Sequence, residues 1–394
     1  MVNTNVIYCG DCLDILKQFP DNCIDLIYLD PPFFSNKQYE IIWGNHAELR
    51  AFGDRWKGGI NHYIGWMKER LEQCQRVLKK TGLIYLHCDW HASHYLKIMM
   101  DKIFTENNFK NEIVWCYGGG GMPKQDFGRK HDIILRYSKT SKYTFHPLFK
   151  PYAETTLKVG RHSTLSGGKP LNVKGTPITD WWSDLKDLTS YSKEWLGYPT
   201  QKPESLLQRI IETSCNKEDI VLDPMVGGGT TIAVAHKLGR KWIGIDVSPT
   251  ACKVAQKRMR SLGVRNIVVL GLPKSVAELK KLPHFEFQNW VCNQLSGRIS
   301  DKKSGDMGID GWTFDNVPIQ VKQSEDVGRN VIDNFETAIR RGEKKKGIIV
   351  AFSFGKGAVE EVARVKETEG LDIKLLNVDE ILKAGFNLTD LFKN

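Results

Sequence analysis

The 394-residue sequence predicts an α/β protein of two domains, the larger with a mostly parallel sheet and the smaller a second α/β unit. Three observations predict this fold class. Short apolar runs at 24–29 and 220–222 open directly into turns rich in proline or glycine, as buried parallel strands do. Helical patterns alternate with such runs up to residue 272, and a new series of strands and helices starts after residue 285. The chain length independently favours two domains.

The domain boundaries follow from these changes in pattern. We assign residues 1–272 to the first domain, 273–284 to a linker, and 285–394 to the second domain. Between residues 138 and 198 the alternation stops, and basic residues such as Lys139 are mixed with aromatic residues such as Trp182. This mixture is typical of an insert that contacts nucleic acid. The loop-rich stretch 34–63 is expected to close over a bound base.

The first apolar run ends in a tetrapeptide suited to activating an amino group. Its residues are Asp30, Pro31, Pro32 and Phe33. The exocyclic nitrogen of a base is a weak nucleophile because its lone pair is delocalised into the ring. If Asp30 and the Pro31 carbonyl each accept one amino hydrogen, the lone pair is directed at an incoming methyl group. The prolines fix the backbone, and Phe33 offers a stacking surface to a base that has left its duplex. Taken alone, the tetrapeptide is also compatible with a rigid turn.

The second run leads into a glycine loop that could hold a nucleoside. We expect a strand at 220–222, a tight turn at 227–229, a helix at 230–238 and a further strand at 242–245. Asp246 lies 23 residues after Asp223, near the spacing at which an acidic residue reaches ribose hydroxyls. The loop lacks the lysine of an ATP-type phosphate loop, which suits a donor without phosphate; the alternative is a plain turn. The candidate donor-binding residues here are Asp223, Met225, Gly227, Gly229, Thr230 and Asp246.

Together, the two motifs resemble the amino-methyltransferases of DNA, in the branch where the catalytic tetrapeptide precedes the glycine loop. The resemblance implies a Rossmann-like domain that transfers a methyl group from S-adenosyl-L-methionine to adenine N6. Cytosine N4 is the alternative target, although cytosine enzymes more often carry serine in place of Asp30. Cytosine C5 chemistry is not supported, because none of the 15 prolines precedes a cysteine.

The resemblance also assigns donor-site residues outside the glycine loop. It implies that Asp11 reaches the adenine of the donor and that Thr200 and Lys202 line the donor pocket, with Pro203 starting the next helix. Met225 departs from the family, which usually has phenylalanine there, so weaker donor affinity is expected. His87 and Asp89 are interpreted as pocket-lining residues at a strand end in preference to general bases.

The second domain carries two further motifs. A Gly-Asp-x-Gly-x-Asp-Gly run at 305–311 enters a strand, and the next strand contains Gln-x-Lys. They resemble the catalytic domain of Mrr-type restriction endonucleases. This resemblance implies a Mg²⁺-dependent nuclease in a restriction-modification system. Its expected site residues are Asp310 and the Val321 carbonyl for the metal, with Gln320, Lys322 and the helix carboxylate Glu286. The alternative is an inactive DNA-binding module.

Composition narrows the partners and the compartment. The net charge is +10, yet the chain from Lys274 onward has 19 basic and 19 acidic residues, so the whole excess lies in the first domain. A basic first domain fits double-stranded DNA as partner. Nine scattered cysteines with one C-x-x-C pair indicate reduced thiols without a zinc site.

The sequence lacks both a membrane-span pattern and a signal-peptide pattern. No apolar stretch approaches membrane-span length and no signal peptide precedes the first strand, so we expect a cytoplasmic protein of a prokaryote or phage, without a membrane partner. A regulator with decayed catalytic sites and an RNA or protein methyltransferase are the remaining alternatives. The oligomeric state stays open.

Overall fold

The computed structural model describes residues 2–34, 59–118, 123–159, 170–189, 191–196, 200–295, 297–300 and 308–383, together with 386, 388, 391 and 392. Contacts divide the chain into two compact units. The first contains the described residues up to Val247 and those of Ala251–Gly271. The second contains the described residues of Leu272–Asn394 and the three residues Ser248–Thr250. Most of the loop expected at 34–63 lies outside the described residues.

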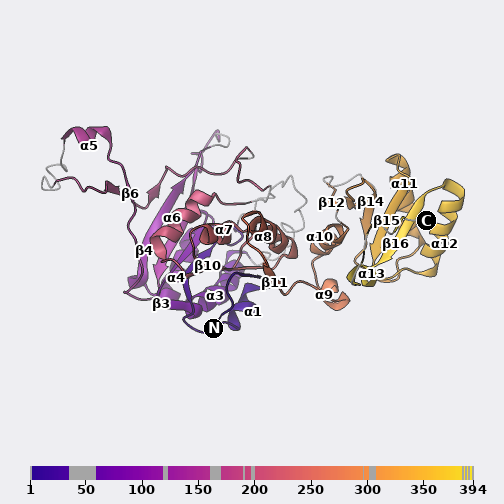
Figure 1. Ribbon diagram of the computed structural model, residues 1–394, viewed down its shortest axis with the longest axis horizontal. Coiled ribbons are helices and arrows are strands. Elements are labelled where there is room, and N and C mark those ends of the chain that lie inside the picture. The colour runs from indigo at the N-terminus through magenta and orange to yellow at the C-terminus, as the bar shows by residue number, and fades with distance from the viewer. Residues whose placement is uncertain are drawn as a thin grey trace. The chain divides into compact units, whose positions relative to one another are not determined.

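The first unit is built on a sheet with nine strands among the described residues (Figure 1). Their order across the sheet is β11-β1-β10-β9-β2-β3-β5-β4-β8, and antiparallel pairing is confined to β5 with its two neighbours. The strands are β1 (Val6–Cys9), β2 (Ile24–Leu29), β3 (Leu78–Cys88), β4 (Phe109–Cys116), β5 (His131–Ser138), β8 (Trp181–Trp182), β9 (Ile220–Asp223), β10 (Lys241–Asp246) and β11 (Val268–Leu270).

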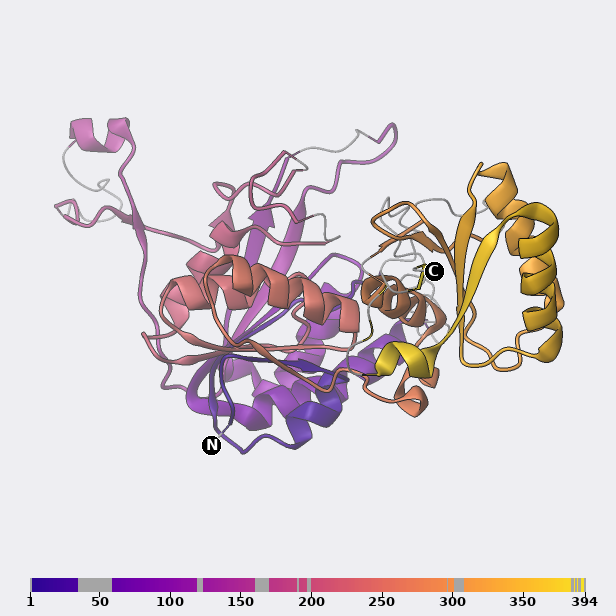
Figure 2. The same cartoon turned by 45° about the vertical axis from the view of Figure 1, so that its right-hand side comes forward.

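Helices cover both faces of this sheet, as the apolar runs of its central strands require. One face carries α6 (Glu204–Ser214), α7 (Thr230–Lys237) and α8 (Pro249–Ser261), and the other carries α1 (Cys12–Lys17), α3 (Gly59–Val77) and α4 (Ser93–Phe104) (Figures 1 and 2). A 3₁₀ turn, η1 (Glu106–Asn108), leads into β4. The expected helix after Thr200 begins at Glu204, because Pro203 has extended backbone angles and caps the helix from outside.

The expected DNA-contacting insert is only partly separate from this core. It contains β6 (Phe149–Lys150), α5 (Glu154–Val159) and β7 (Thr176–Pro177), and then returns to the main sheet as β8. Trp182 is buried there, and its indole N–H donates to the Thr179 carbonyl, so its expected DNA contact is wrong. The Lys139 ammonium likewise bonds the carbonyls of Arg76 and Leu78. Packing holds the Trp182 side chain inside the protein, and hydrogen bonds hold the Lys139 ammonium against backbone carbonyls. Composition alone does not reveal either contact.

The second unit contains a five-stranded sheet of order β12-β13-β14-β15-β16. Its strands are β12 (Arg298–Ile299), β13 (Gly311–Trp312), β14 (Pro318–Val321), β15 (Lys346–Ala351) and β16 (Asp372–Asn377). Strands β14, β15 and β16 are parallel, whereas β12, β13 and β14 form an antiparallel meander. The helices are α10 (His284–Gln294), α11 (Arg329–Arg341), α12 (Lys356–Glu369) and α13 (Val378–Leu382).

The stretch expected to be a linker is partly helical. Ser275 and Glu278 form a capping box at the start of α9 (Val276–Lys280). Leu279 on this helix is fully buried in the apolar cluster of the second unit. The linker prediction is therefore wrong for these residues. Although α9 is short and flanked by prolines, it packs its apolar side chain into the core of the second unit.

Two general properties of the described residues bear on the expectations above. No described helix combines the length and the apolar character needed to cross a membrane. All nine cysteines are free thiols. Burial raises the pKa of several of these thiols, among them Cys12 and Cys292, each to about 12.

Candidate active sites

The two motifs of the first unit meet because their strands are neighbours. β2 pairs in parallel with β9, with Leu26 beside Val221 and Ile27 beside Leu222. The carboxyl ends of both strands therefore lie at one edge of the sheet. The helix that follows β9 covers one face and the helix that follows β2 covers the other, which makes this edge a topological switch point where α/β folds bind ligands.

The catalytic tetrapeptide adopts a defined arrangement at this edge. The Lys202 ammonium lies 2.6 Å from Asp30 Oδ2, and both side chains are largely buried. The same ammonium lies 5.1 Å from the centre of the Phe33 ring. Lys202, which was predicted to line the donor pocket, thus contacts the two residues expected to hold the target base. Lys202 engages one oxygen of Asp30, and no other described side chain engages this carboxylate, so its second oxygen could accept an amino hydrogen.

A buried polar network supports Phe33 from below. The His87 ring lies 5.8 Å from the Phe33 ring and is fully buried. Its Nδ1 lies 2.8 Å from the Tyr28 hydroxyl and its Nε2 lies 3.1 Å from Asp132 Oδ2. The Tyr117 hydroxyl donates to the other oxygen of Asp132 at 2.9 Å. Both ring nitrogens of His87 are therefore engaged by other buried side chains.

The charge of this network is concentrated on Asp132. Burial alone would raise the pKa of Asp132, but the hydrogen bond and charge of His87, the charge of Lys202 and the Tyr117 hydroxyl together lower it. The pKa of Tyr117 is raised by burial and by the nearby Asp132 carboxylate. An ionised Asp132 thus fixes the orientation of the His87 ring below Phe33.

The glycine loop closes against β10. Gly227 N–H donates to Asp246 Oδ2 at 2.9 Å, and Val226 N–H donates to the Ile245 carbonyl at 2.8 Å. Gly229 has φ +79°, and a Cβ at this position would lie 3.0 Å from the Cα of Ala255 on α8. Any larger residue there would be strained and would push α8 away. The loop therefore places its backbone N–H groups and the Asp246 carboxylate side by side.

Asp223 is the most perturbed acid of this site. Burial raises its pKa to about 7, and the charges of Asp30 and Asp246 act in the same direction. Hydrogen bonds from Thr231 and from the Met225 N–H, the latter at 3.0 Å, oppose the rise only in part. Asp223 is 3% exposed, and its carboxyl group stabilises the loop by accepting from the Met225 N–H.

A buried cation that the sequence did not reveal ties the glycine loop to α6. Arg258 on α8 is 6% exposed, and its guanidinium donates to Thr230 Oγ1 at 2.9 Å and to Glu204 Oε1 at 3.0 Å. Glu204 begins α6, two residues after Lys202. The signal that could have revealed Arg258 is its place on the otherwise apolar face of α8, next to Met259 and one turn from Ala255.

The remaining predicted donor residues vary in how closely they approach the loop. Asp11 caps α1, because its Oδ1 accepts from Leu13 N–H, and its Oδ2 pairs with the buried Arg70 at 2.5 Å. Met225 is half-buried within the loop. Thr200 is exposed and has φ +62°. The structure thus brings Met225 and Thr230 to the loop and shows Asp11 engaged by the start of α1 and by Arg70 on α3.

The second unit gathers most of its predicted residues across β13 and β14. Asp310 Oδ2 accepts from Val321 N–H at 2.7 Å, and Asp310 N–H donates to the Ile319 carbonyl at 2.8 Å. Gln320 is 2% exposed, and its Oε1 has no hydrogen-bond partner among the described residues. Lys322 follows at once, and its charge adds to burial in lowering the pKa of His284 on α10. Glu286 is buried on the same helix.

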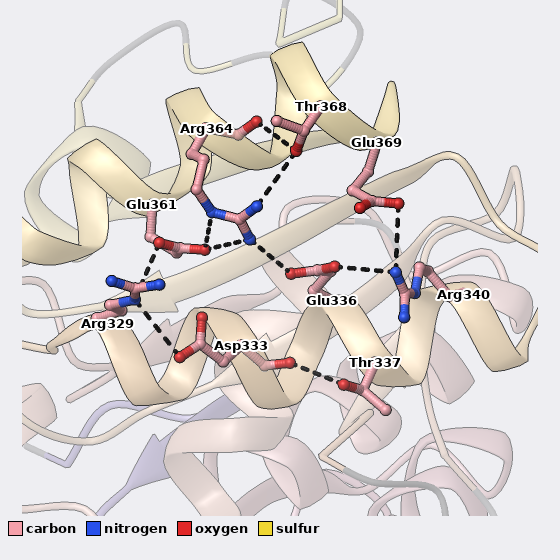
Figure 3. A network of polar contacts seen from close by, with 9 residues as sticks. All are labelled: Arg329, Asp333, Glu336, Thr337, Arg340, Glu361, Arg364, Thr368 and Glu369. Carbon is pink, nitrogen blue, oxygen red and sulfur yellow. Dashed lines mark hydrogen bonds and ion pairs between the residues drawn. The ribbon is translucent and has the colours of Figure 1, made fainter.

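A separate acidic cluster lies between α11 and α12. Its members are Asp333, Glu336 and Glu361, whose carboxylate oxygens lie close enough to one another to suit a metal ion (Figure 3). Arg329 lies 3.0 Å from Glu361, and Arg364 contacts both glutamates. The three carboxylates are thus neutralised by arginine, and the cluster joins the two helices.

Comparison with known proteins bears on both units. A family model described as DNA methylase matches residues 24–257, more than half of the chain. The chain belongs to this DNA methylase family. A second family model, described as restriction endonuclease, matches residues 279–384. The DNA methylase match confirms the predicted class of enzyme, and the sheets and helices described above agree with the predicted α/β fold class.

Individual relatives of this DNA methylase are similar along the first unit. It is 34% identical over 257 residues to the DNA adenine methyltransferase YhdJ of Escherichia coli K12, covering 64% of this chain and 81% of that protein. It is 30% identical over 268 residues to the type II methyltransferase M.HinfI of Haemophilus influenzae, covering 66% and 69%. Among solved structures, the PvuII DNA methyltransferase (cytosine-N4-specific) is 18% identical, covers 64% and 85%, and has a TM-score of 0.45.

Proposed function

We propose that the first unit transfers the methyl group of S-adenosyl-L-methionine to adenine N6 in double-stranded DNA. The observation that carries this proposal is the meeting of Asp30–Phe33 and Asp223–Gly229 at the ends of the adjacent strands β2 and β9. Family membership supports methyl transfer to DNA, and the relative named as an adenine methyltransferase supports the target atom.

The proposed chemistry assigns a task to each residue of the pocket. Asp30 and the Pro31 carbonyl accept the two amino hydrogens, so the nitrogen lone pair points toward the donor. Phe33, held by His87 below it, stacks on the flipped base. Lys202 fixes the direction of the Asp30 carboxylate through its 2.6 Å contact. When bound, S-adenosyl-L-methionine would supply an electrophilic methyl carbon to this nitrogen, with its thioether as the leaving group, and the amino proton would pass to solvent.

Mapping the modified bases in DNA from an expressing host tests the target. We expect N6-methyladenine at a defined sequence, and a rate that falls about 10²-fold or more in Asp30→Ala. Asp14→Ala on the exposed face of α1 is the matched control and should methylate like the parent. N4-methylcytosine as the product would contradict the adenine assignment, and full activity of Asp30→Ala would contradict the catalytic one.

We assign the ribose of the donor to Asp246. Its Oδ2 already accepts from Gly227 N–H, so replacement affects both the loop and the ligand. Asp246→Asn can keep one acceptor for Gly227 while losing the charge, and Asp246→Ala loses both. Calorimetry should show weaker donor binding in Asp246→Asn and still weaker binding in Asp246→Ala. Unchanged affinity in both variants would show that the donor lies elsewhere.

We further propose that the second unit is a Mg²⁺-dependent DNA nuclease in a restriction-modification system. The residues present suit this ion, because Mg²⁺ prefers oxygen ligands and the buried Gln320 Oε1, without a partner among the described residues, lies on the strand paired with the Asp310 segment. Asp310 and the Val321 carbonyl would hold the metal together with Gln320. Lys322 would orient the attacking water, with Glu286 on α10 as the helix carboxylate.

Incubation of the purified protein with Mg²⁺ and unmethylated DNA of varied sequence tests this activity. Asp310→Asn and Lys322→Ala should each abolish cleavage while leaving methylation unchanged, whereas the exposed Lys356→Ala should cleave like the parent. Equal cleavage by all variants would point to a contaminating nuclease. No cleavage of any DNA by the parent would leave the second unit a binding module.

A further inference from the structure

The described ends of the loop between β4 and β5 connect to the hydrogen-bond network beside Phe33. Its two ends are joined at the pocket network, because the Tyr117 hydroxyl donates to Asp132, which bonds His87 below Phe33. The backbone closes the same stem, with Tyr117 N–H donating to the Lys130 carbonyl at 2.9 Å. The described ends of this loop are thus held by residues that also shape the pocket.

A cation–π stack anchors the described part of the loop, residues 123–130. The Arg129 guanidinium lies 4.2 Å from the centre of the Trp90 ring. Trp90 follows the end of β3 and stacks on His91, with ring centroids 3.7 Å apart. The Asp89 carboxylate accepts from the His91 backbone N–H and is hydrogen-bonded to Nδ1 of the His91 ring. The loop is therefore held against the end of the strand that carries His87.

Phe127 lies in this anchored loop with its side chain in solvent. It is 97% exposed, so almost the whole ring is open to a binding partner. The charged residues of the loop are Lys124, Arg129 and Lys130 against the single acid Asp126. An exposed aromatic ring among cations, in a loop tied to the network beside Phe33, suits a duplex, in which phosphates flank stacked bases.

We propose that Phe127 inserts into the DNA duplex at the position vacated by the flipped base, where it stacks on the neighbouring bases. The inference rests on the proposed function of the first unit. Flipping breaks the stacking on both sides of the target base, and a ring of this size refills the gap. The cations beside Phe127 then contact the flanking phosphates. Phe127 is thus a positioning residue for base flipping and touches no reacting atom.

This role predicts a defect that depends on the structure of the substrate. Once the target sequence is mapped, Phe127→Ala should lower kcat/KM on duplex DNA by about 10- to 100-fold, the range of one aromatic–base stack. The loss should shrink to less than about threefold on a single strand with the same sequence, and on a duplex in which the target base is mismatched. Phe127→Trp should restore duplex activity, because it keeps a stacking ring.

Two further measurements separate this role from general damage. With 2-aminopurine at the target position, the fluorescence increase on binding should be several-fold smaller for Phe127→Ala than for the parent. Phe314→Ala, which removes an equally large ring that is 88% exposed in the second unit, should behave like the parent. Normal duplex activity of Phe127→Ala, or an equal loss on single strands, would overturn the proposal that the Phe127 ring inserts into the duplex. Failure of the parent to methylate any DNA would contradict the proposed function itself and the inserted ring with it.

Discussion

Three carboxyl groups, Asp30, Asp223 and Asp246, lie at the ends of the adjacent strands β2, β9 and β10. Asp223 is the most deeply buried of them, and its pKa of about 7 exceeds that of an ordinary carboxyl because burial disfavours its charge. A carboxyl that holds its proton up to neutral pH makes the stability of the first unit depend on pH.

The sign of this dependence follows from proton binding. The unfolded Asp223 carboxyl ionises near pH 4, whereas the folded one keeps its proton until about pH 7. Between these values the folded state binds more protons, so its stability falls as pH rises, by on the order of 4 kcal/mol at most. We expect the unfolding free energy of Asp223→Asn minus that of the parent to increase from pH 4 to pH 7, because only the parent loses stability over this range, and then to level off. A pH-independent difference in urea denaturation would contradict the raised pKa.

The sequence predicted some of these residues and not others for a physical reason. Asp30 and Phe33, like Asp223 and Asp246, immediately follow apolar runs, so their place at a strand end could be inferred locally. The contact of Lys202 with Asp30 joins residues far apart in sequence, and the position of Asp132 depends on the antiparallel direction of β5. Nothing in the local pattern specifies either.

At the scale of secondary-structure elements, Arg258 joins α8, the glycine loop and the start of α6. Arg258→Met should leave Glu204 short of a buried partner and destabilise the first unit by about 3 kcal/mol or less, since Glu204 keeps its ion pair with Lys237. We also expect weaker donor binding, because Thr230 loses its donor of a hydrogen bond. Arg260→Met, on the exposed side of the same helix, is the control for thermal unfolding and calorimetry. Equal behaviour of the two variants would contradict this role.

The entrance to β13 depends on one glycine. Gly308 has φ +97°, and a Cβ there would lie 2.4 Å from Gln320 Nε2. Gly308→Ala should therefore displace Gln320, destabilise the second unit by about 1–3 kcal/mol, and abolish metal-dependent cleavage. Gly357→Ala at the start of α12 meets only an ordinary contact, 3.8 Å from Arg329 Cβ, and should be tolerated. Retention of cleavage by Gly308→Ala would separate Gln320 from the nuclease site.

Elements were predicted well where their patterns were long and poorly where tertiary contacts decide. The strand, glycine turn, helix and strand from Ile220 to Asp246 agree with expectation to within one or two residues. The two-residue strand β8 and the short helix α9 were missed. Each buries a large side chain, Trp182 or Leu279, in contacts with residues distant in sequence, which no short sequence window reveals.

At the scale of the whole molecule, the uneven charge of the two domains predicts how salt affects DNA binding. The segment from Lys274 onward is neutral overall, so the phosphate contacts should come from the first domain. We expect a fragment of residues 1–272 to methylate DNA and to show the same slope of log affinity against log salt as the full chain, within about one unit. If the slope for the fragment were smaller than that for the full chain by several units, some phosphate contacts would have to come from the second domain.

The order of the two sheets along the chain has a consequence for the nascent chain during translation. The strands described in the first sheet all end by Leu270, whereas those described in the second begin at Arg298. Domains fold as units while the ribosome adds roughly 5–20 residues per second, so the last 120 or so residues take about 6–25 s to follow. During that interval the first unit of each nascent chain can fold before the second unit has been synthesised. If the second unit cleaves DNA as proposed, this order of synthesis would let methylation begin before cleavage.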